Sequence, residues 1–332
     1  MILYLIHRFK RAWKHMILAT FFFIVVIFIL FIAFAEYGMP YMPIVPVRQT
    51  SIALPSDYGL QSEILEVEAD TNLILKGYFI HALTPPKATI ILLHGIGSNK
   101  ENWLGYARLL AENGFNCVVY DQRAHGKSGG TFCTFGFYEK FDVSKIVDTL
   151  LSRADILPVG IQGASLGGAV ALQALGHDKR LSFGIVESTF NTLENVIEEY
   201  GYDYFKVRSR WLARHVLSKS ALIARFRPFE VKPVDACREI DQPILIVHGD
   251  SDEKIPINFN KENFTALKSA DKEFFIVQGA GHDNVGEIGG EKYRQKIFGF
   301  LNRILKRPLS IEAPKREKKF QRIKKMFKRR RK

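Results

Sequence analysis

Residues 163–167 read Gly-Ala-Ser-Leu-Gly, a G-x-S-x-G motif with Ser165 at its centre. An apolar, strand-like run ends at Ile161 just before the motif, and a helix-forming run begins at Leu166 just after the serine. A sharp turn between a strand and a helix exposes the hydroxyl of such a serine to a substrate carbonyl. The motif therefore predicts that Ser165 is a nucleophile, and the alternative is an ordinary serine at a strand–helix turn.

A serine hydroxyl becomes a good nucleophile only when a base takes its proton, and that base must be oriented by a third group. His282, the only histidine after residue 248, lies in a loop beyond the last expected strand and is the candidate base. The alternative for His282 is a histidine in a surface loop. The acid remains open among Asp252, Asp250 and Glu187, each of which lies at or just beyond the end of an earlier apolar run.

Six apolar runs rich in branched residues are too continuous for half-exposed strands, and they are typical of a parallel sheet covered on both faces. These runs are 88–93, 115–120, 156–161, 183–186, 244–247 and 274–277. Two further strands, 64–68 and 73–80, are expected to form a hairpin around residues 70–72. Helices are expected at about 101–112, 139–152, 166–176, 257–268 and 291–305.

The alternation of strands and helices predicts an α/β protein with a mostly parallel, doubly wound sheet. This domain is expected to span residues 60–305. Residues 190–240 interrupt the alternation because they are too long for a simple crossover helix. We expect them to form a small helical cap over the carboxyl edge of the sheet.

Four sequence strings together resemble the α/β-hydrolase superfamily, and most of all its monoacylglycerol-lipase-like and serine-aminopeptidase-like esterase branch. They are His94-Gly95-Ile96-Gly97, the string from Asp121 to Ser128, the G-x-S-x-G motif, and the string from His248 to Pro256. The resemblance covers the expected domain and leaves out the two ends of the chain.

The resemblance implies the α/β-hydrolase fold and a role for each of five residues. Ser165, Asp252 and His282 would form the catalytic triad, because the last string matches H-G-x-x-D-x-x-V/I-P, whose aspartate is the family's triad acid. The backbone N–H groups of Ile96 and Leu166 would form the oxyanion hole. The resemblance implies neither a cofactor nor a metal.

The expected function is hydrolysis of a small-molecule carboxylic ester through an acyl-enzyme intermediate. A lipid-like ester or thioester is favoured by the membrane segment described below, and a peptidase is the weaker interpretation. A dinucleotide-binding enzyme is disfavoured, because Lys100 stands where the fingerprint that begins at Gly95 needs its third glycine. The alternative from a different class is a non-catalytic membrane-associated scaffold that binds polyanions through its basic tail.

Residues 16–35 contain no Asp, Glu, Lys or Arg and are long enough for one transmembrane helix. Residues 1–15 carry four Lys/Arg and no acid, so this segment is expected to be cytoplasmic and the hydrolase domain extracytoplasmic. An A-x-A sequence at 33–35 leaves a cleaved signal peptide, and therefore a secreted protein, as the alternative. Residues 36–59, which contain four prolines, are expected to be an extended linker.

The formal net charge of +13 arises at the two ends of the chain. The C-terminal tail, 306–332, carries twelve Lys/Arg and one acid within residues 315–332, which leaves residues 16–314 close to neutral. This distribution does not predict a nucleic-acid-binding domain. Phe320, Ile323 and Phe327 recur at helical spacing among the basic residues, as in an amphipathic helix that binds lipid, and a solvated charge run is the alternative.

Overall fold

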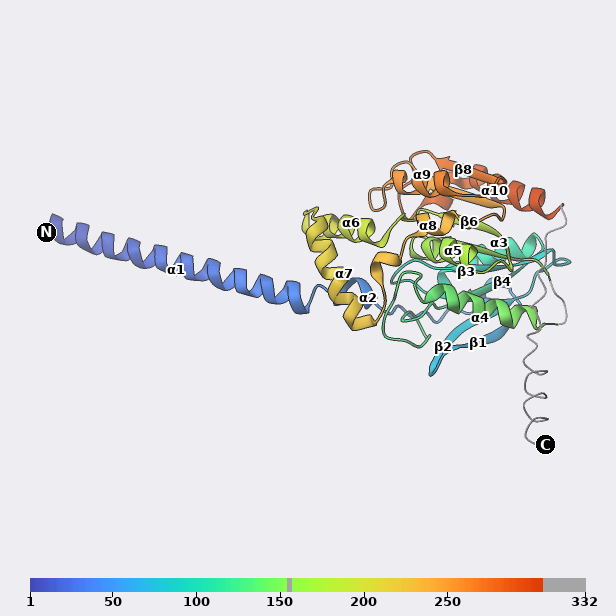
Figure 1. Cartoon of the computed structure of the whole chain (residues 1–332), viewed down its shortest axis with the longest axis horizontal. Helices are drawn as coiled ribbons and strands as arrows, with labels where there is room; N and C mark the ends of the chain where they lie inside the picture. The colour runs from blue at the N-terminus through green and yellow to red at the C-terminus, as the bar shows by residue number, and fades with distance from the viewer. Residues whose placement is uncertain (154–156, 307–332) are drawn as a thin grey trace, which may run out of the picture.

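A computed structural model of the chain describes residues 1–153 and 157–306 (Figure 1). The expected amphipathic helix at 315–332 lies outside the described residues and stays a prediction. The first residue of the expected strand 156–161 also lies outside them.

The centre of the molecule is one eight-stranded sheet in the order β1-β2-β4-β3-β5-β6-β7-β8. The strands are β1 (Ser62–Asp70), β2 (Leu73–Ile80), β3 (Ala88–Leu93), β4 (Phe115–Tyr120), β5 (Val159–Ala164), β6 (Leu181–Glu187), β7 (Ile244–Gly249) and β8 (Lys272–Val277). β2 pairs antiparallel with β1 and β4, and all other neighbours are parallel. The predicted hairpin and the predicted parallel sheet are both confirmed.

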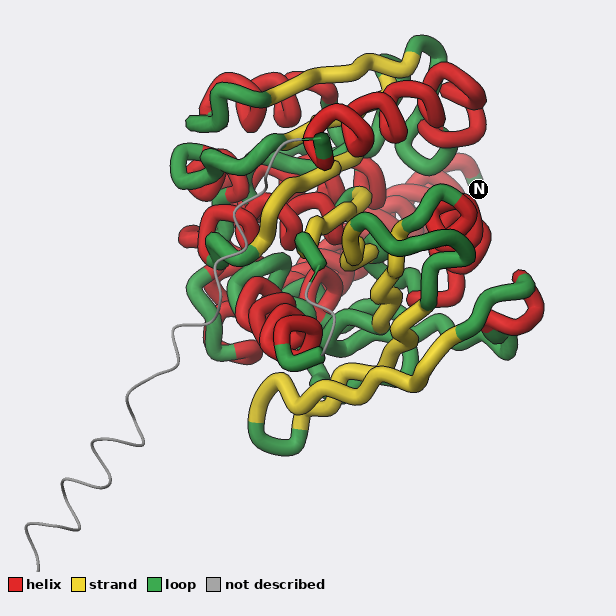
Figure 2. The backbone as a smooth tube through the Cα atoms, turned by 90° about the vertical axis from the view of Figure 1, so that its right-hand side faces the viewer, coloured by secondary structure: helices red, strands yellow, loops and turns green. Residues whose placement is uncertain are grey.

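Helices cover both faces of the sheet, as Figure 2 shows. The helices α3 (Leu104–Glu112) and α10 (Val285–Leu305) contribute to one apolar core, and α4 (Glu139–Leu151), α5 (Leu166–His177), α8 (Pro233–Cys237) and α9 (Ile257–Ala266) contribute to the other. Within β3, Ile90 and Leu92 join the first core, whereas Ile91 and Leu93 join the second. Since successive side chains of a strand point to opposite faces, the continuous apolar run predicts this double burial.

Two elements differ from their predicted bounds for identifiable reasons. β5 begins after Pro158, which has no N–H to donate to the sheet, and it continues to Ala164, so that Ser165 follows the strand directly. α10 begins at Val285 and is bent at Gly290, whose φ of 49° is not helical. The glycines at 289–290 interrupt the helical periodicity of the sequence. The sequence therefore predicts only the part of α10 that follows them.

The segment between β6 and β7 is helical, as predicted for the cap. It contains α6 (Leu193–Phe205), α7 (Arg210–Ala224), the short η3 (Pro228–Glu230) and α8. Elsewhere, short helical turns are η1 (Pro55–Tyr58) and η2 (Lys100–Trp103). The cap helices α6 and α7 lie at the end of the molecule that carries the N-terminal helix (Figure 1).

The N-terminal helix α1 (Ile2–Tyr37) projects away from the sheet and is followed by the one-turn helix α2 (Tyr41–Ile44) (Figure 1). Among the described residues, α1 contains the one segment long and apolar enough to cross a membrane. A signal sequence near the N-terminus has the same length and composition, so α1 is an anchor or a signal by this criterion.

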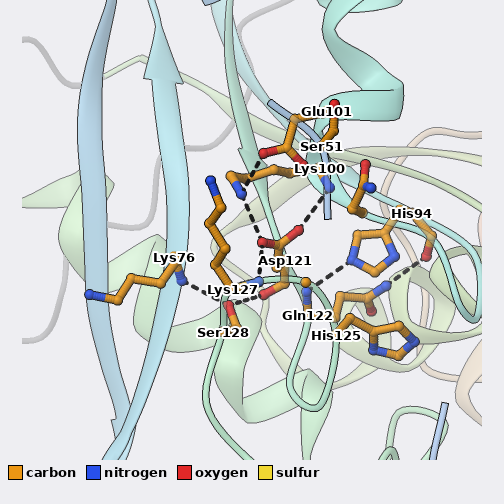
Figure 3. A network of polar contacts seen from close by, with 12 residues as sticks. Ser51, Lys76, His94, Lys100, Glu101, Asp121, Gln122, His125, Lys127 and Ser128 are labelled. Atoms are coloured by element: carbon orange, nitrogen blue, oxygen red, sulfur yellow. Dashed lines mark hydrogen bonds and ion pairs between the residues drawn. The ribbon is translucent and has the colours of Figure 1, made fainter. Parts of the chain in front are cut away.

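A buried ionic cluster joins the loop after β3 to the loop after β4 (Figure 3). Asp121 is fully buried, and its carboxylate accepts hydrogen bonds from the backbone N–H of Lys100 at 2.9 Å and from the Lys100 ammonium at 2.8 Å. The backbone N–H of Lys127 donates to the same carboxylate. Burial opposes the charge on Lys100, but its hydrogen bonds to Asp121 and Glu101 outweigh that effect and raise its pKa.

This cluster also rules out the dinucleotide interpretation. The position of the third fingerprint glycine holds Lys100, and the acid that would bind a ribose, Asp121, is occupied by the Lys100 ammonium. The pair is therefore part of the scaffold that positions the two loops.

We predict that Lys100→Met lowers the free energy of unfolding by about 3–5 kcal/mol, because it leaves Asp121 buried without its cation. Lys127→Met is the matched control, since the exposed Lys127 contacts Asp121 only through its backbone N–H. Thermal or urea unfolding of the full chain in detergent measures both variants. Equal stability of Lys100→Met and wild type would contradict the structural role of the pair.

Candidate active site

Ser165 lies on a tight turn between β5 and α5, with φ of 56° and ψ of −120°. A side chain cannot fit at the flanking glycines, because a Cβ on Gly163 would lie 2.2 Å from the carbonyl oxygen of Gly167. A Cβ on Gly167 would likewise lie 2.1 Å from the carbonyl oxygen of Leu93. The backbone of Ser165 is fixed further by its N–H, which donates to the carbonyl of Glu187 at 2.9 Å. The turn is therefore strained and held by its neighbours.

The structure brings the three predicted triad residues together from three separate loops. The Ser165 hydroxyl lies 3.0 Å from Nε2 of His282, and Nδ1 of His282 lies 2.8 Å from Oδ2 of Asp252. Because the carboxylate can only accept, the ring proton lies on Nδ1 and leaves Nε2 free to accept the serine proton. This arrangement has the geometry that general-base activation of a serine requires.

Asp252 lies in a loop after β7 that is built to hold a carboxylate. Its Oδ1 accepts the backbone N–H groups of Lys254 at 3.0 Å and Ile255 at 2.9 Å. Burial alone would raise the pKa of Asp252, but its contacts with His248 and His282 and the backbone N–H groups outweigh burial and hold the pKa well below its usual range. Asp252 is therefore charged throughout the neutral range.

The two other candidates for the acid have different partners. Asp250 Oδ1 accepts the backbone N–H of Gly279 at 2.6 Å, which ties two loops together. Glu187 is buried, and its Oε1 accepts the Tyr293 hydroxyl at 2.6 Å and the side-chain amide of Gln162 at 2.8 Å. Burial raises the pKa of Glu187. Of the three acids, only Asp252 has a hydrogen bond with His282 among the described contacts.

The loop that carries Ile96 is held beside Ser165 by a buried neutral histidine. The backbone N–H of Gln122 donates to Nε2 of His94 at 3.0 Å, so the His94 proton lies on Nδ1 and is donated to the carbonyl of Gly95 at 2.8 Å. Burial lowers the pKa of His94 to about 4. Ile96 lines the same cavity as Ser165, and Leu166 is the first residue of α5, where backbone N–H groups lack helical partners.

A cavity of about 980 Å³ contains Ser165 and His282 in its wall. The cap and residues 39–49 also line this cavity. The proline pattern predicts an extended linker for these residues and does not reveal this contribution. The signal in the sequence is that large apolar or aromatic residues separate the first three prolines, namely Tyr41, Met42, Ile44 and Val45.

Arg48 is a further residue that the sequence does not single out. Its guanidinium donates to the carbonyls of His125, Gly126 and Ser128 at 3.2, 3.0 and 2.7 Å, and to that of Gly130. These bonds fasten the N-terminal segment to the loop after β4. A lone arginine in a proline-containing stretch gives no pattern from which such contacts could be predicted.

We predict that stability falls with decreasing pH in a way that depends on His94. The pKa of His94 is about 4 in the folded protein and about 6.5 in an unfolded chain. The unfolded state therefore binds more protons between these values, and folding stability is lost as the pH falls through this window. From pH 7 to 4, wild type should lose about 3 kcal/mol more than His94→Gln. Denaturant unfolding across this range tests the prediction, and parallel curves would contradict it.

Three comparisons with known proteins agree with this architecture. A family described as the alpha/beta hydrolase fold matches residues 88–218. The uncharacterized protein YqkD of Bacillus subtilis is 28% identical over 261 residues, which cover 78% of this chain and 81% of YqkD. The uncharacterized peptidase YuxL of the same organism is 21% identical over 274 residues, or 77% of this chain and 39% of YuxL.

Among solved structures, the esterase Pf2001 of Pyrococcus furiosus superposes with a TM-score of 0.66 at 25% identity, over 78% of this chain and 99% of the esterase. Because this match covers 78% of the chain, it does not depend on the short motifs alone. The matching family model, the sheet topology and the solved esterase structure therefore agree that the chain has the α/β-hydrolase fold.

Proposed function

We propose that the protein is a serine hydrolase that cleaves carboxylic esters through an acyl-enzyme intermediate. The observation that carries the proposal is the continuous hydrogen-bonded chain from Ser165 through His282 to Asp252, with spacings of 3.0 and 2.8 Å. The similarity to an esterase structure supports an ester substrate.

In the first half of the proposed cycle, Ser165 Oγ attacks the ester carbonyl while His282 Nε2 takes the serine proton. Asp252 keeps the His282 ring in its productive tautomer and stabilises the imidazolium that forms. His282 then gives its proton to the leaving alcohol. In the second half, His282 activates a water molecule, which releases the acid and restores Ser165.

The backbone N–H groups of Ile96 and Leu166 are the proposed donors to the negative oxygen of the tetrahedral intermediate. Each such donor contributes about 3–4 kcal/mol to transition-state stabilisation, because it is already in place before charge develops. The hydrogen bonds of His94 support this role for Ile96, since they fix the loop next to Ser165.

We propose further that α1 anchors the hydrolase to a membrane as a single-pass protein with residues 1–15 in the cytoplasm. The uncharged run of 20 residues and the basic residues before it support this orientation. The buried contact of Ala35 with the cap supports an anchor over a cleaved signal, because cleavage after Ala35 would remove this residue from the core.

We predict that Ser165→Ala abolishes both ester hydrolysis and labelling by a fluorophosphonate probe, with a loss in turnover on the order of 10⁶. The matched control is Ser218→Ala, because Ser218 is exposed on α7 and bonds only the carbonyl of Arg214. Hydrolysis of p-nitrophenyl acetate by the full chain in detergent is the assay. Wild-type protein that neither hydrolyses any ester nor takes the label would favour the non-catalytic scaffold.

We predict that Asp252→Asn lowers kcat/KM by about 10⁴, since an amide no longer holds the correct tautomer of His282. Asp250→Asn and Glu187→Gln should have far smaller effects, because neither acid contacts His282 among the described contacts. The three variants are compared with p-nitrophenyl acetate, and circular dichroism checks their folding. If Asp252→Asn lowered kcat/KM only slightly and Glu187→Gln lowered it strongly, the catalytic acid would be Glu187 at the end of β6.

A further inference from the structure

We propose that the segment that follows α1, residues 39–47, is a specificity-determining wall of the acyl pocket. Through this wall the pocket takes a long-chain lipid ester directly from the bilayer that holds α1. The inference rests on the proposed hydrolase function and on α1 as an anchor, and it assigns the substrate class that these two proposals leave open.

No spacer separates the proposed membrane helix from the cap. The uncharged run ends at Ala35, and the next residue, Glu36, pairs with His215 at 2.9 Å and Lys219 at 2.6 Å. Ala35 is buried against the cap in one small apolar cluster with Val216. Because the hydrocarbon boundary must lie close to the end of an uncharged run, α7 lies at the membrane surface.

The segment after α1 is held at both ends. The Ser220 hydroxyl donates to the carbonyl of Pro40 at 2.7 Å, which fixes the beginning of the segment to α7. The backbone N–H of Cys133 donates to the carbonyl of Ile44 at 2.8 Å, and Arg48 binds the loop after β4. The segment is therefore a fixed wall between the bilayer and the sheet, and not a free tether.

The wall of residues 39–47 contributes apolar side chains to the cavity that contains Ser165. Met39, Met42 and Val45 line the cavity from the wall, and Leu212 and Val216 line it from α7. A cavity of about 980 Å³ lies at the upper end of the range for small-molecule sites, so it can hold a long chain. Methionine is flexible and fills irregular apolar space, which suits an acyl chain.

Exposed aromatic residues gather at the same end of the molecule. They belong to the end of α1, to α2, and to the end of α6 and the start of α7 (Figure 1): Tyr37, Tyr41, Tyr204, Phe205 and Trp211. Trp211 is 74% exposed and Tyr204 is 70% exposed, which is unusual for aromatic rings in water. Tyrosine and tryptophan are enriched where a protein meets the headgroup region.

These observations place an apolar cavity, a nucleophile and an aromatic rim at the boundary of one leaflet. The proposed substrate is a lipid whose ester-linked acyl chain is as long as those of membrane lipids. This lipid leaves the leaflet past the wall of residues 39–47. The ester carbonyl then reaches Ser165 while the acyl chain lies along the apolar side chains that the wall and α7 contribute to the cavity.

The test uses the full-length protein in vesicles of ether-linked phospholipid, which the enzyme cannot hydrolyse. We compare kcat/KM for p-nitrophenyl palmitate and p-nitrophenyl acetate in wild type, Met42→Asp and Met42→Leu. Wild type should favour palmitate. Met42→Asp should lower the ratio of kcat/KM for palmitate to that for acetate at least tenfold, because it puts a charge beside the acyl chain. The conservative variant Met42→Leu should keep this ratio within twofold of wild type.

Ile64→Asp is the matched control, since Ile64 is 80% exposed on β1 and does not line the cavity. Its ratio should equal that of wild type. A second pair of variants tests the attachment of the wall to α7. Glu36→Lys should lower the ratio, because the new lysine repels Lys219 and His215. The double variant Glu36→Lys/Lys219→Glu should return the ratio to the wild-type value. Fluorophosphonate labelling identifies any variant that has lost its folded site, and Met42→Gln then replaces Met42→Asp.

The outcomes separate the two proposals. A labelled wild-type protein that hydrolyses acetate but shows no preference for palmitate overturns the inference and leaves the proposed function intact. An unchanged ratio in both Met42→Asp and Glu36→Lys also overturns it. A wild-type protein that takes no label and cleaves neither ester overturns the proposed function itself.

Discussion

The constraint on which the site depends is the crowding of backbone around Ser165. β3, β5 and the start of α5 approach so closely that a side chain at Gly163 or Gly167 would collide with a carbonyl oxygen. The serine is thereby forced to a positive φ, and its hydroxyl is turned toward His282. A strained residue persists only when its surroundings over-determine it. Here the parallel sheet supplies that constraint, because it fixes β3 and β5 side by side.

Two buried polar groups near this turn, Asp252 and His94, are each held in one protonation state. Asp252 is kept charged by donors that surround its carboxylate, and His94 is kept neutral by burial. Fixed charges and tautomers of this kind require no reorganisation when charge develops during a reaction. The two sides of Ser165 thus differ in charge for reasons that lie in burial and hydrogen bonding.

The sheet and the grouping of the three proposed triad residues could be predicted from the sequence, because both follow from local patterns. Continuous apolar runs specify buried parallel strands, and the carboxyl ends of such strands bring Ser165, Asp252 and His282 to one edge. The choice of Asp252 over Asp250 required a family resemblance, since both follow the same strand. The geometry distinguishes them, because Asp250 turns toward the backbone of Gly279.

The contribution of the N-terminal segment could not be predicted, because it depends on contacts between residues far apart in the chain. Prolines at 40, 43 and 46 indicate an irregular backbone and say nothing of what that backbone touches. The pairing of Glu36 with Lys219 and the bond from Ser220 to Pro40 each join residues about 180 positions apart in the sequence. They arise only once the cap has folded over the sheet. The same cap that covers Ser165 therefore also fixes the direction of α1. In the proposed membrane-anchored protein, packing of α1 against the cap, and not the length of a linker, would set the depth of Ser165 relative to the membrane.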